Sequence, residues 1–220
     1  MAKVNSTCRD SVAIMKDTEM ERILVWDWPT RLGHWGLVLA FAVAYLSGDS
    51  EEWRLVHVWA GGALAGIIGF RIAWGLVGTR HARFASFVRG PAAAIDYVKA
   101  LLRGQAPHFT GHNPAGGWAI LALLGLGLGT AATGWPLYQD LDIEAFEDLH
   151  EGLVNAMLAV VGVHLAGVVV GSLAHRENLA RAMVTGWKQG QADEAIRSGR
   201  AWALLILAAS AGLSAWWFAL

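Results

Sequence analysis

The chain has 220 residues, of which 55% are hydrophobic and 16% are charged, and its formal net charge is −1. Soluble domains average about 45–50% apolar and about 25% charged residues, so this composition excludes an ordinary soluble globular protein. The near-neutral charge and the absence of a basic nucleic-acid patch argue against a nucleic-acid-binding protein. Cys8 is the single cysteine, which excludes an intrachain disulfide and argues against a cysteine-based metal site.

The N-terminal residues 1–22 are polar and charged and lack the apolar core of a cleaved signal peptide. The motif Trp26-Asp27-Trp28-Pro29 follows and predicts the start of a first helix at the membrane surface. Tryptophan favours the headgroup level, and proline favours the first turn of a helix.

Five apolar runs predict membrane spans, because crossing a hydrocarbon core takes about 20 helical residues. They are residues 32–47, 55–77, 118–135, 149–173 and 201–220. Between the second and third runs, residues 91–102 have apolar residues at helical spacing and predict a surface helix. Asn113 and Pro114 then predict an N-cap and the first position of the next helix.

Glycine pairs four residues apart occur in two of these spans: Gly62 with Gly66, and Gly125 with Gly129. Small residues at this spacing allow two helices to approach closely in a membrane. They equally leave room for a flat cofactor, and spacing alone does not choose between these interpretations.

The basic residues predict the orientation of the chain. If the N-terminus is cytoplasmic, every lysine and arginine except Arg54 falls in the inner segments 1–31, 71–117 and 174–200. The positive-inside rule therefore predicts a cytoplasmic N-terminus and a periplasmic C-terminus. The outer segments carry nine carboxylates: Asp49, Glu51, Glu52, Asp140, Asp142, Glu144, Glu147, Asp148 and Glu151.

Four of the eight histidines fall within or at the ends of the predicted spans: His34, His57, His150 and His164. His150 and His164 are fourteen residues apart in one span, which is a rise of about 21 Å with a return to nearly the same helix face. The order of the spans places His57 at the outer depth of His150, and His34 at the inner depth of His164.

Two imidazoles from different helices at one depth suit axial ligation of a haem iron. The alternative is that each histidine hydrogen-bonds a neighbouring helix or belongs to a proton path. Two depth-matched pairs favour two b-type haems, and the absence of C-x-x-C-H predicts that they are not covalently attached.

Two arginines lie beside the inner pair. Arg71 follows His57 by fourteen residues and therefore shares its helix face at the inner depth, where a haem propionate is a suitable partner. Arg31 precedes His34 by one turn and is predicted either to bind a propionate or to be an ordinary basic flank.

Several motifs resemble the bacterial cytochrome b561 family, which includes the b-type subunits of nickel–iron hydrogenases. They are VWDWPTRLGHWGL, the histidine early in the second span, FRIAWGLVGTRHARF, GHNPAGGWAI and LHEGLVNAMLAVVGVHLAGV. The resemblance covers residues 23–188 and implies a four-helix bundle with two haems b. It implies one ligand each from the first two spans and two from the fourth, which here are His34, His57, His150 and His164.

The resemblance also implies electron transfer between the quinone pool and a partner on the outer face. The start of the first span is closer to the free-standing branch of the family, whose partners are periplasmic c-type cytochromes. The nine outer carboxylates favour such a basic partner, although short outer loops are in any case poor in lysine and arginine. The tail and the fifth span fall outside the shared core.

Other functions remain open at this stage. They are a hydrogenase b-type subunit, a superoxide:quinone oxidoreductase, whose anionic substrate the acidic face would repel, and a haem-free transporter or assembly factor. A quinone site is expected at the inner side, near His108 and His112, which could equally be capping or turn residues.

The sequence thus predicts an all-α integral membrane protein of the bacterial cytoplasmic membrane, alone or as a subunit of an oligomer or complex. The predicted parts are a polar cytoplasmic tail (1–22), a dihaem four-helix domain (23–188), a cytoplasmic linker (189–200) and a C-terminal transmembrane helix (201–220).

Overall fold

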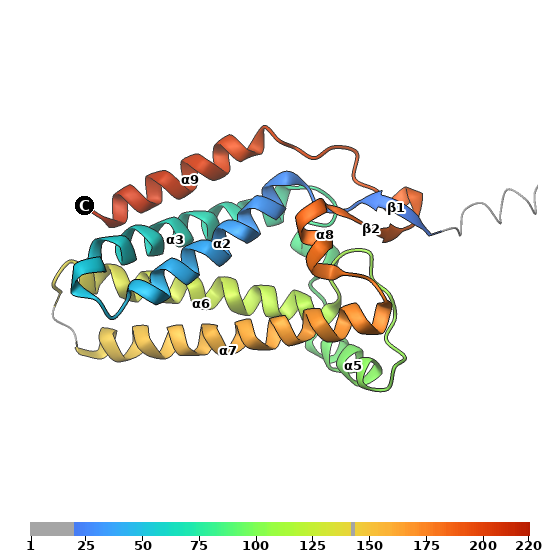
Figure 1. The fold of residues 1–220 in the computed structure, drawn as a ribbon, viewed down its shortest axis with the longest axis horizontal. Helices are drawn as coiled ribbons and strands as arrows, with labels where there is room; N and C mark the ends of the chain where they lie inside the picture. The colour runs from blue at the N-terminus through green and yellow to red at the C-terminus, as the bar shows by residue number, and fades with distance from the viewer. Residues whose placement is uncertain (1–19, 142–143) are drawn as a thin grey trace, which may run out of the picture.

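The computed structural model describes residues 20–141 and 144–220. Four long helices lie side by side, each antiparallel to the one before it in the chain (Figure 1). They are α2 (Trp28–Ser47), α3 (Arg54–Val77), α6 (Pro114–Tyr138) and α7 (Glu144–His175), and a fifth helix, α9 (Ala203–Phe218), packs along α3. The helical architecture agrees with the predicted all-α class.

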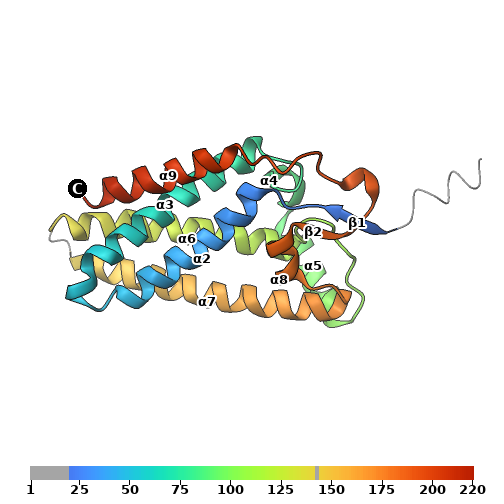
Figure 2. The ribbon, with the colours of Figure 1, turned by 45° about the horizontal axis from the view of Figure 1, so that its top comes forward.

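The two ends of the bundle differ in structure (Figure 2). The first, called here the sheet end, carries the small elements β1 (Glu21–Leu24), α4 (Phe84–Phe87), α5 (Pro91–Leu102), α8 (Leu179–Thr185), β2 (Trp187–Gly190) and η2 (Ala192–Glu194). The second, called the acidic end, carries η1 (Glu51–Trp53), the end of α6, the start of α7 and the C-terminus of the chain.

Among the described residues, three helices are long and apolar enough to cross a membrane: Glu51–Val77, Pro114–Tyr138 and Ala145–His175. Helix α2 has 20 residues but does not meet the same criterion, because polar residues such as Arg31 and His34 interrupt its first half. Helix α9 has 16 residues and is a shorter apolar helix. The four-plus-one arrangement of spans therefore stays a prediction.

Local signals in the sequence determine where the helices begin. The Asp27 side chain accepts a hydrogen bond from the Thr30 backbone N–H at 2.8 Å and caps α2, with Pro29 in the first turn. Asn113 caps α6 in the same way through the Gly116 N–H at 2.7 Å, with Pro114 at the first position. The predicted surface helix at 91–102 is α5, with the same bounds.

A two-stranded antiparallel sheet, which the sequence did not predict, joins the start of the bundle to the segment after α7. Strands β1 and β2 pair with Glu21 opposite Gly190 and Leu24 opposite Trp187. Each strand has only four residues, too few for a convincing alternation of apolar and polar side chains. The two strands are far apart in the sequence, so no turn motif indicates that they pair.

The structure resolves the two interpretations of the glycines in α3. A Cβ built at Gly62 would lie 2.8 Å from the Ala215 Cα, and one at Gly66 would overlap the Ser210 carbonyl. The Ser210 hydroxyl donates to the Gly66 carbonyl at 2.8 Å. These glycines therefore allow close packing of α9 on α3. In α6, by contrast, Gly125 has no neighbour within 4 Å of a built Cβ.

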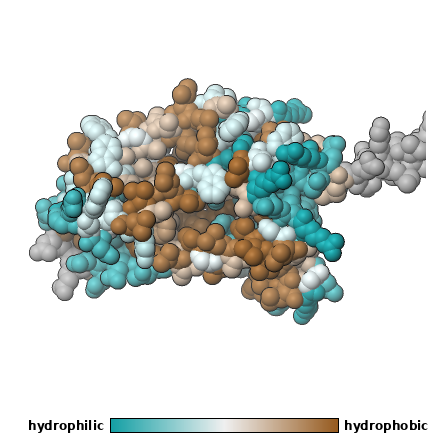
Figure 3. Space-filling model, in the orientation of Figure 1, coloured by the Kyte–Doolittle hydropathy of each residue, from teal (hydrophilic) through white to brown (hydrophobic). Residues whose placement is uncertain are grey.

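Apolar side chains gather on the middle of the molecule and hydrophilic ones at both ends (Figure 3). Large residues such as Leu46, Val163 and Leu173 are more than two-thirds exposed on the long helices. Exposed apolar surface of this extent marks an interaction or membrane surface. Together with the three candidate spans, it identifies a membrane protein.

Candidate functional site

The structure brings the four predicted histidines together in two pairs. The rings of His57 on α3 and His150 on α7 lie 6.1 Å apart between centroids, near the acidic end. The rings of His34 on α2 and His164 on α7 lie 6.5 Å apart, toward the sheet end. These are the pairs that the helix spacing predicted.

Backbone carbonyls orient the acidic-end pair. His57 Nδ1 donates to the Ala44 carbonyl at 2.8 Å, and His150 Nδ1 donates to the Thr130 carbonyl at 3.0 Å, with the Thr133 hydroxyl 3.2 Å away. A proton held on Nδ1 leaves the Nε2 lone pair available. Metal-ligating histidines are commonly fixed in this way through the other ring nitrogen.

At the sheet end, buried polar atoms on His34 and Arg71 lack hydrogen-bond partners among the described residues. His34 Nδ1 and both terminal nitrogens of Arg71 are buried and make no hydrogen bond in the described part of the chain. The Arg71 guanidinium lies 4.9 Å from the centre of the Phe84 ring. A buried guanidinium without an acceptor is costly, so this site suits an anionic group such as a propionate.

Arg31 is placed differently from Arg71. Its guanidinium stacks 4.2 Å from the Trp28 ring and donates to the Val184 carbonyl at the end of α8. Its Nε is buried without a hydrogen-bond partner. The structure thus gives Arg31 a role in attaching α8 to α2, with one terminal nitrogen engaged by the Val184 carbonyl.

The space between the histidines suits a flat group. Helix α7 packs closely along α6, whereas α2 packs on α3 and α9. The face between α2 and α7 is hollowed and lined with apolar side chains (Figure 3). At Gly134 a Cβ would lie 2.8 Å from His150 Cε1, so the glycine leaves room for this imidazole. Paired imidazoles, a buried cation and an apolar hollow fit haem.

A third histidine pair, His108 with His175, has ring centroids 5.6 Å apart but does not share these features. His108 Nε2 lies 3.4 Å from a Glu177 carboxylate oxygen, and His175 Nε2 lies 3.4 Å from the Tyr97 hydroxyl. Their Nε2 atoms are thus engaged by protein groups. Among the described residues no group of three or more His, Cys, Asp or Glu could hold a bare metal ion.

The two loop histidines predicted near a quinone site have separate environments. His108 Nε2 lies 3.4 Å from a partly buried Glu177 carboxylate, which also lies 3.4 Å from Lys188 Nζ. His112 lies between Trp26 and Phe87, with centroids at 4.5 and 4.6 Å, and its Nδ1 is buried without a partner. Burial, reinforced by the nearby charges of Arg71 and Lys188, lowers the pKa of His112 well below 6.5.

Asp27 is the residue near the site whose importance the sequence did not reveal. Its side chain is 1% exposed and accepts hydrogen bonds from Trp74 Nε1 at 3.0 Å and from the Thr79 hydroxyl at 2.6 Å, besides capping α2. It therefore ties the first turn of α2 to the end of α3. The place of Asp27 just before the first helix predicts the capping bond to Thr30. Nothing in the sequence predicts the bonds from Trp74 and Thr79.

At the acidic end, the described carboxylates lie on exposed loops and helix ends. Arg54 makes 3.5 Å ion pairs with Glu51 and Asp140, whose side chains are 87% and 89% exposed. Ion pairs this exposed contribute little stability and leave the surface negative. Asp142 and the side chain of Glu144 lie outside the described residues.

The fold and the histidine pairs define a class of protein: a membrane helical bundle able to hold haem between its helices. The prokaryotic cytochrome b561 family matches residues 25–186. The chain belongs to this family, and it is a membrane b-type cytochrome of electron transfer. No curated protein and no solved structure matches the chain.

Proposed function

We propose that this cytochrome carries electrons across the cytoplasmic membrane between the quinone pool and a periplasmic c-type cytochrome, within a domain spanning residues 23–188. The observation that carries the proposal is the presence of two histidine pairs along α7, one toward each end of the bundle. A haem b between two imidazoles supplies one-electron iron chemistry when bound. The chain itself supplies the four imidazoles and holds them in position.

We assign His57 and His150 to one haem and His34 and His164 to the other. Arg71 neutralises a propionate at the sheet end, where its terminal nitrogens have no acceptor. Substitution of His57 or His150 by Ala should remove the same haem, and substitution of His34 or His164 the other. The haemochrome content should fall from two per chain to one in each case.

A control comes from α7 itself. His175→Ala removes a histidine that also faces another imidazole, but whose Nε2 is engaged by Tyr97. This variant should retain two haems with an unchanged visible spectrum. Loss of a haem from His175→Ala, or matching losses from His57→Ala and His34→Ala, would contradict the assignment.

We place the quinone site at the sheet end beside His112. This imidazole is flanked by aromatic rings, near Arg71 and His164, and has an unpartnered Nδ1. A neutral imidazole can exchange a proton with a quinone oxygen. His112→Gln should slow haem reduction by quinol while leaving reduction by dithionite intact. His108→Gln, at the contact with Glu177, is the matched control.

The acidic end is the docking surface of the proposed partner. Exposed carboxylates attract a basic cytochrome and raise its association rate, an effect that salt screens. Neutralising Glu147, Asp148 and Glu151 together should lower this rate at low ionic strength and flatten its salt dependence. A wild-type rate that is independent of salt would refute this assignment, as would an unchanged rate in the variant.

The proposed orientation, with the N-terminus cytoplasmic and the acidic end periplasmic, rests on the distribution of basic residues along the chain. Cys8 is the only cysteine, which makes the topology directly testable. An impermeant maleimide should leave Cys8 unlabelled in intact spheroplasts. It should label Ser50→Cys in a Cys8→Ser background. The reverse pattern would invert the orientation.

The decisive experiment is the reduced-minus-oxidised spectrum of the purified protein after addition of quinol. Rapid appearance of a b-type signal supports both haem binding and quinol access. If dithionite reduces the haems and quinol does not, quinol is not the electron donor, and the electrons come from a protein partner.

A further inference from the structure

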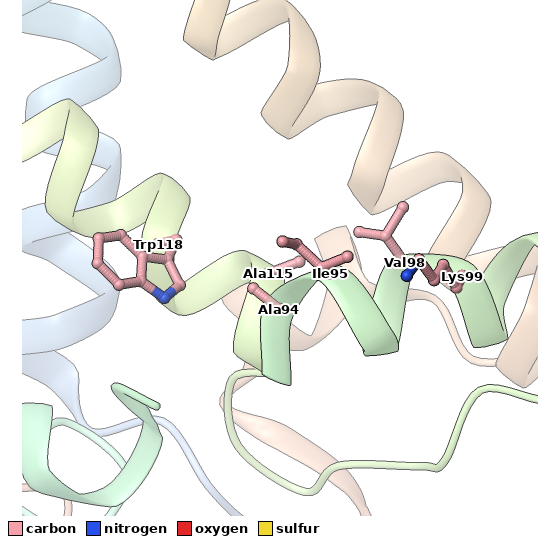
Figure 4. Close-up of a pocket in the computed structure, with 6 residues that line it drawn as sticks. All are labelled: Ala94, Ile95, Val98, Lys99, Ala115 and Trp118. Atoms are coloured by element: carbon pink, nitrogen blue, oxygen red, sulfur yellow. The ribbon is translucent and has the colours of Figure 1, made fainter. Parts of the chain in front are cut away.

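A groove of about 350 Å³ lies between α5 and α6 at the sheet end, and no histidine lines it (Figure 4). Its size falls within the roughly 300–1,000 Å³ typical of small-ligand sites. It is lined by Ala94, Ile95, Val98 and Lys99 of α5 and by Ala115 and Trp118 of α6. The lining is hydrocarbon apart from the ammonium of Lys99 and the indole nitrogen of Trp118.

Helix α5 presents an apolar face beyond the groove. Ile95, Val98 and Leu102 are 55%, 42% and 80% exposed, and their spacing places them on one side of the helix. On the other side, Tyr97 is 5% exposed against the rest of the molecule. A short helix with this division lies in the interfacial plane of a bilayer, with its apolar face toward the acyl chains.

Trp118 indicates that the groove lies at the depth of the lipid headgroups. The Trp118 ring is part of the groove wall, and its Nε1 donates to the Arg89 carbonyl at 2.9 Å. Tryptophan favours this depth, where the apolar ring is in hydrocarbon and the N–H is in a polar layer. The groove therefore opens at the boundary between acyl chains and phosphates.

The charges around the groove favour an anionic occupant. Lys99 is its one charged lining residue, and Arg103, the C-cap residue of α5, follows one turn later. No carboxylate lines the groove. A basic residue near an anionic leaflet adds about 1 kcal/mol of attraction, whereas an isoprenoid tail has no charge for Lys99 to bind.

We propose that this groove binds one acidic phospholipid, with an acyl chain against Ile95, Val98 and Trp118 and the phosphate at Lys99. Burial of the acyl chain supplies hydrophobic free energy, and the ammonium supplies selectivity for an anionic lipid over a zwitterionic one. The bound lipid covers the apolar surface of the groove and holds α5 against the start of α6. The proposal rests on the membrane location of the protein and not on its electron partners.

The test is native mass spectrometry of the delipidated, haem-loaded protein titrated with phosphatidylglycerol or phosphatidylcholine. Wild type should retain one phosphatidylglycerol in preference to phosphatidylcholine. Lys99→Gln should lower the affinity for phosphatidylglycerol by about fivefold. Ala94→Leu, which fills the groove, should lower the affinity for both lipids without changing the haem spectrum.

Matched controls separate this site from general attraction to a basic surface. Arg181→Gln removes an exposed basic residue on α8, and Asp96→Asn removes a carboxylate adjacent to the groove on α5. Neither should weaken phosphatidylglycerol binding. Equal binding by wild type, Lys99→Gln and Ala94→Leu would overturn the proposal. Retention of a quinone in place of the phospholipid would also overturn it.

Discussion

Removal of the Asp27 carboxylate should destabilise the sheet end of the bundle. The side chain is buried and accepts three hydrogen bonds: from the Thr30 backbone N–H, from Trp74 Nε1 and from the Thr79 hydroxyl. In Asp27→Ala the loss of the helix cap costs about 1 kcal/mol. The buried indole N–H of Trp74 and the partly buried hydroxyl of Thr79 each cost about 1–2 kcal/mol more when they lose their acceptor, which gives about 3–5 kcal/mol in total.

Thermal unfolding in detergent measures this effect. A chain of this size loses about 2–4 °C per kcal/mol, so Tm should fall by about 6–20 °C in Asp27→Ala. Asp27→Asn keeps one acceptor oxygen and should lie between the variant and the wild type. Thr79→Val removes one of the three donors. The fall in Tm that it causes should therefore be smaller in the Asp27→Ala background than in the wild type.

The reasoning would fail if Asp27→Ala melted within about 2 °C of wild type. It would also fail if the effects of Asp27→Ala and Thr79→Val added fully, because residues that share a hydrogen bond are energetically coupled. A fall in Tm without such coupling would show that the three hydrogen bonds are not the source of the stability.

Three further predictions follow from close contacts and burial. Gly66→Leu should displace α9 from α3, measured as accelerated proteolysis after residue 190, whereas Gly69→Leu on open helix surface should not. Gly134→Ala should push the His150 imidazole aside and halve the haem content, whereas Gly125→Ala should leave it intact. The third concerns acid. Because burial lowers the pKa of His112 in the folded state, the unfolded chain alone takes up this proton near pH 6.5. The free energy of unfolding should therefore fall by up to about 2 kcal/mol between pH 7 and pH 5. In His112→Gln, this part of the pH dependence should be absent when the free energy is measured by chemical unfolding.

The sequence was sufficient to predict the features that depend on local patterns. Apolar runs predicted the long helices, Asn113 and Pro114 predicted the start of α6, and residues 91–102 proved to be α5. The sequence also predicted that His34 would lie near His164, and His57 near His150. This follows from the fourteen-residue spacing of His150 and His164 on one helix and from the antiparallel order of the spans.

The features that the sequence missed depend on contacts between distant segments. The carbonyls of Ala44 and Thr130 orient His57 and His150, but every residue has a carbonyl, so no residue type marks these partners. The contact of Arg31 with the Val184 carbonyl is similar, and it leaves less of this guanidinium for a propionate than its position near His34 suggested. Pairing of β1 with β2 is also long-range.

Opposite faces of α3 carry the residues of the site and the glycines that contact α9. At 3.6 residues per turn, Gly66 is about 180° from His57, and Gly62 is about 180° from Arg71. One face of α3 therefore presents a histidine and an arginine, and the opposite face packs on α9 through glycines. Packing of α9 does not compete with a haem for space. Consequently Gly66→Leu should detach α9 and still retain two haems, and a loss of haem in that variant would show that the two faces are coupled.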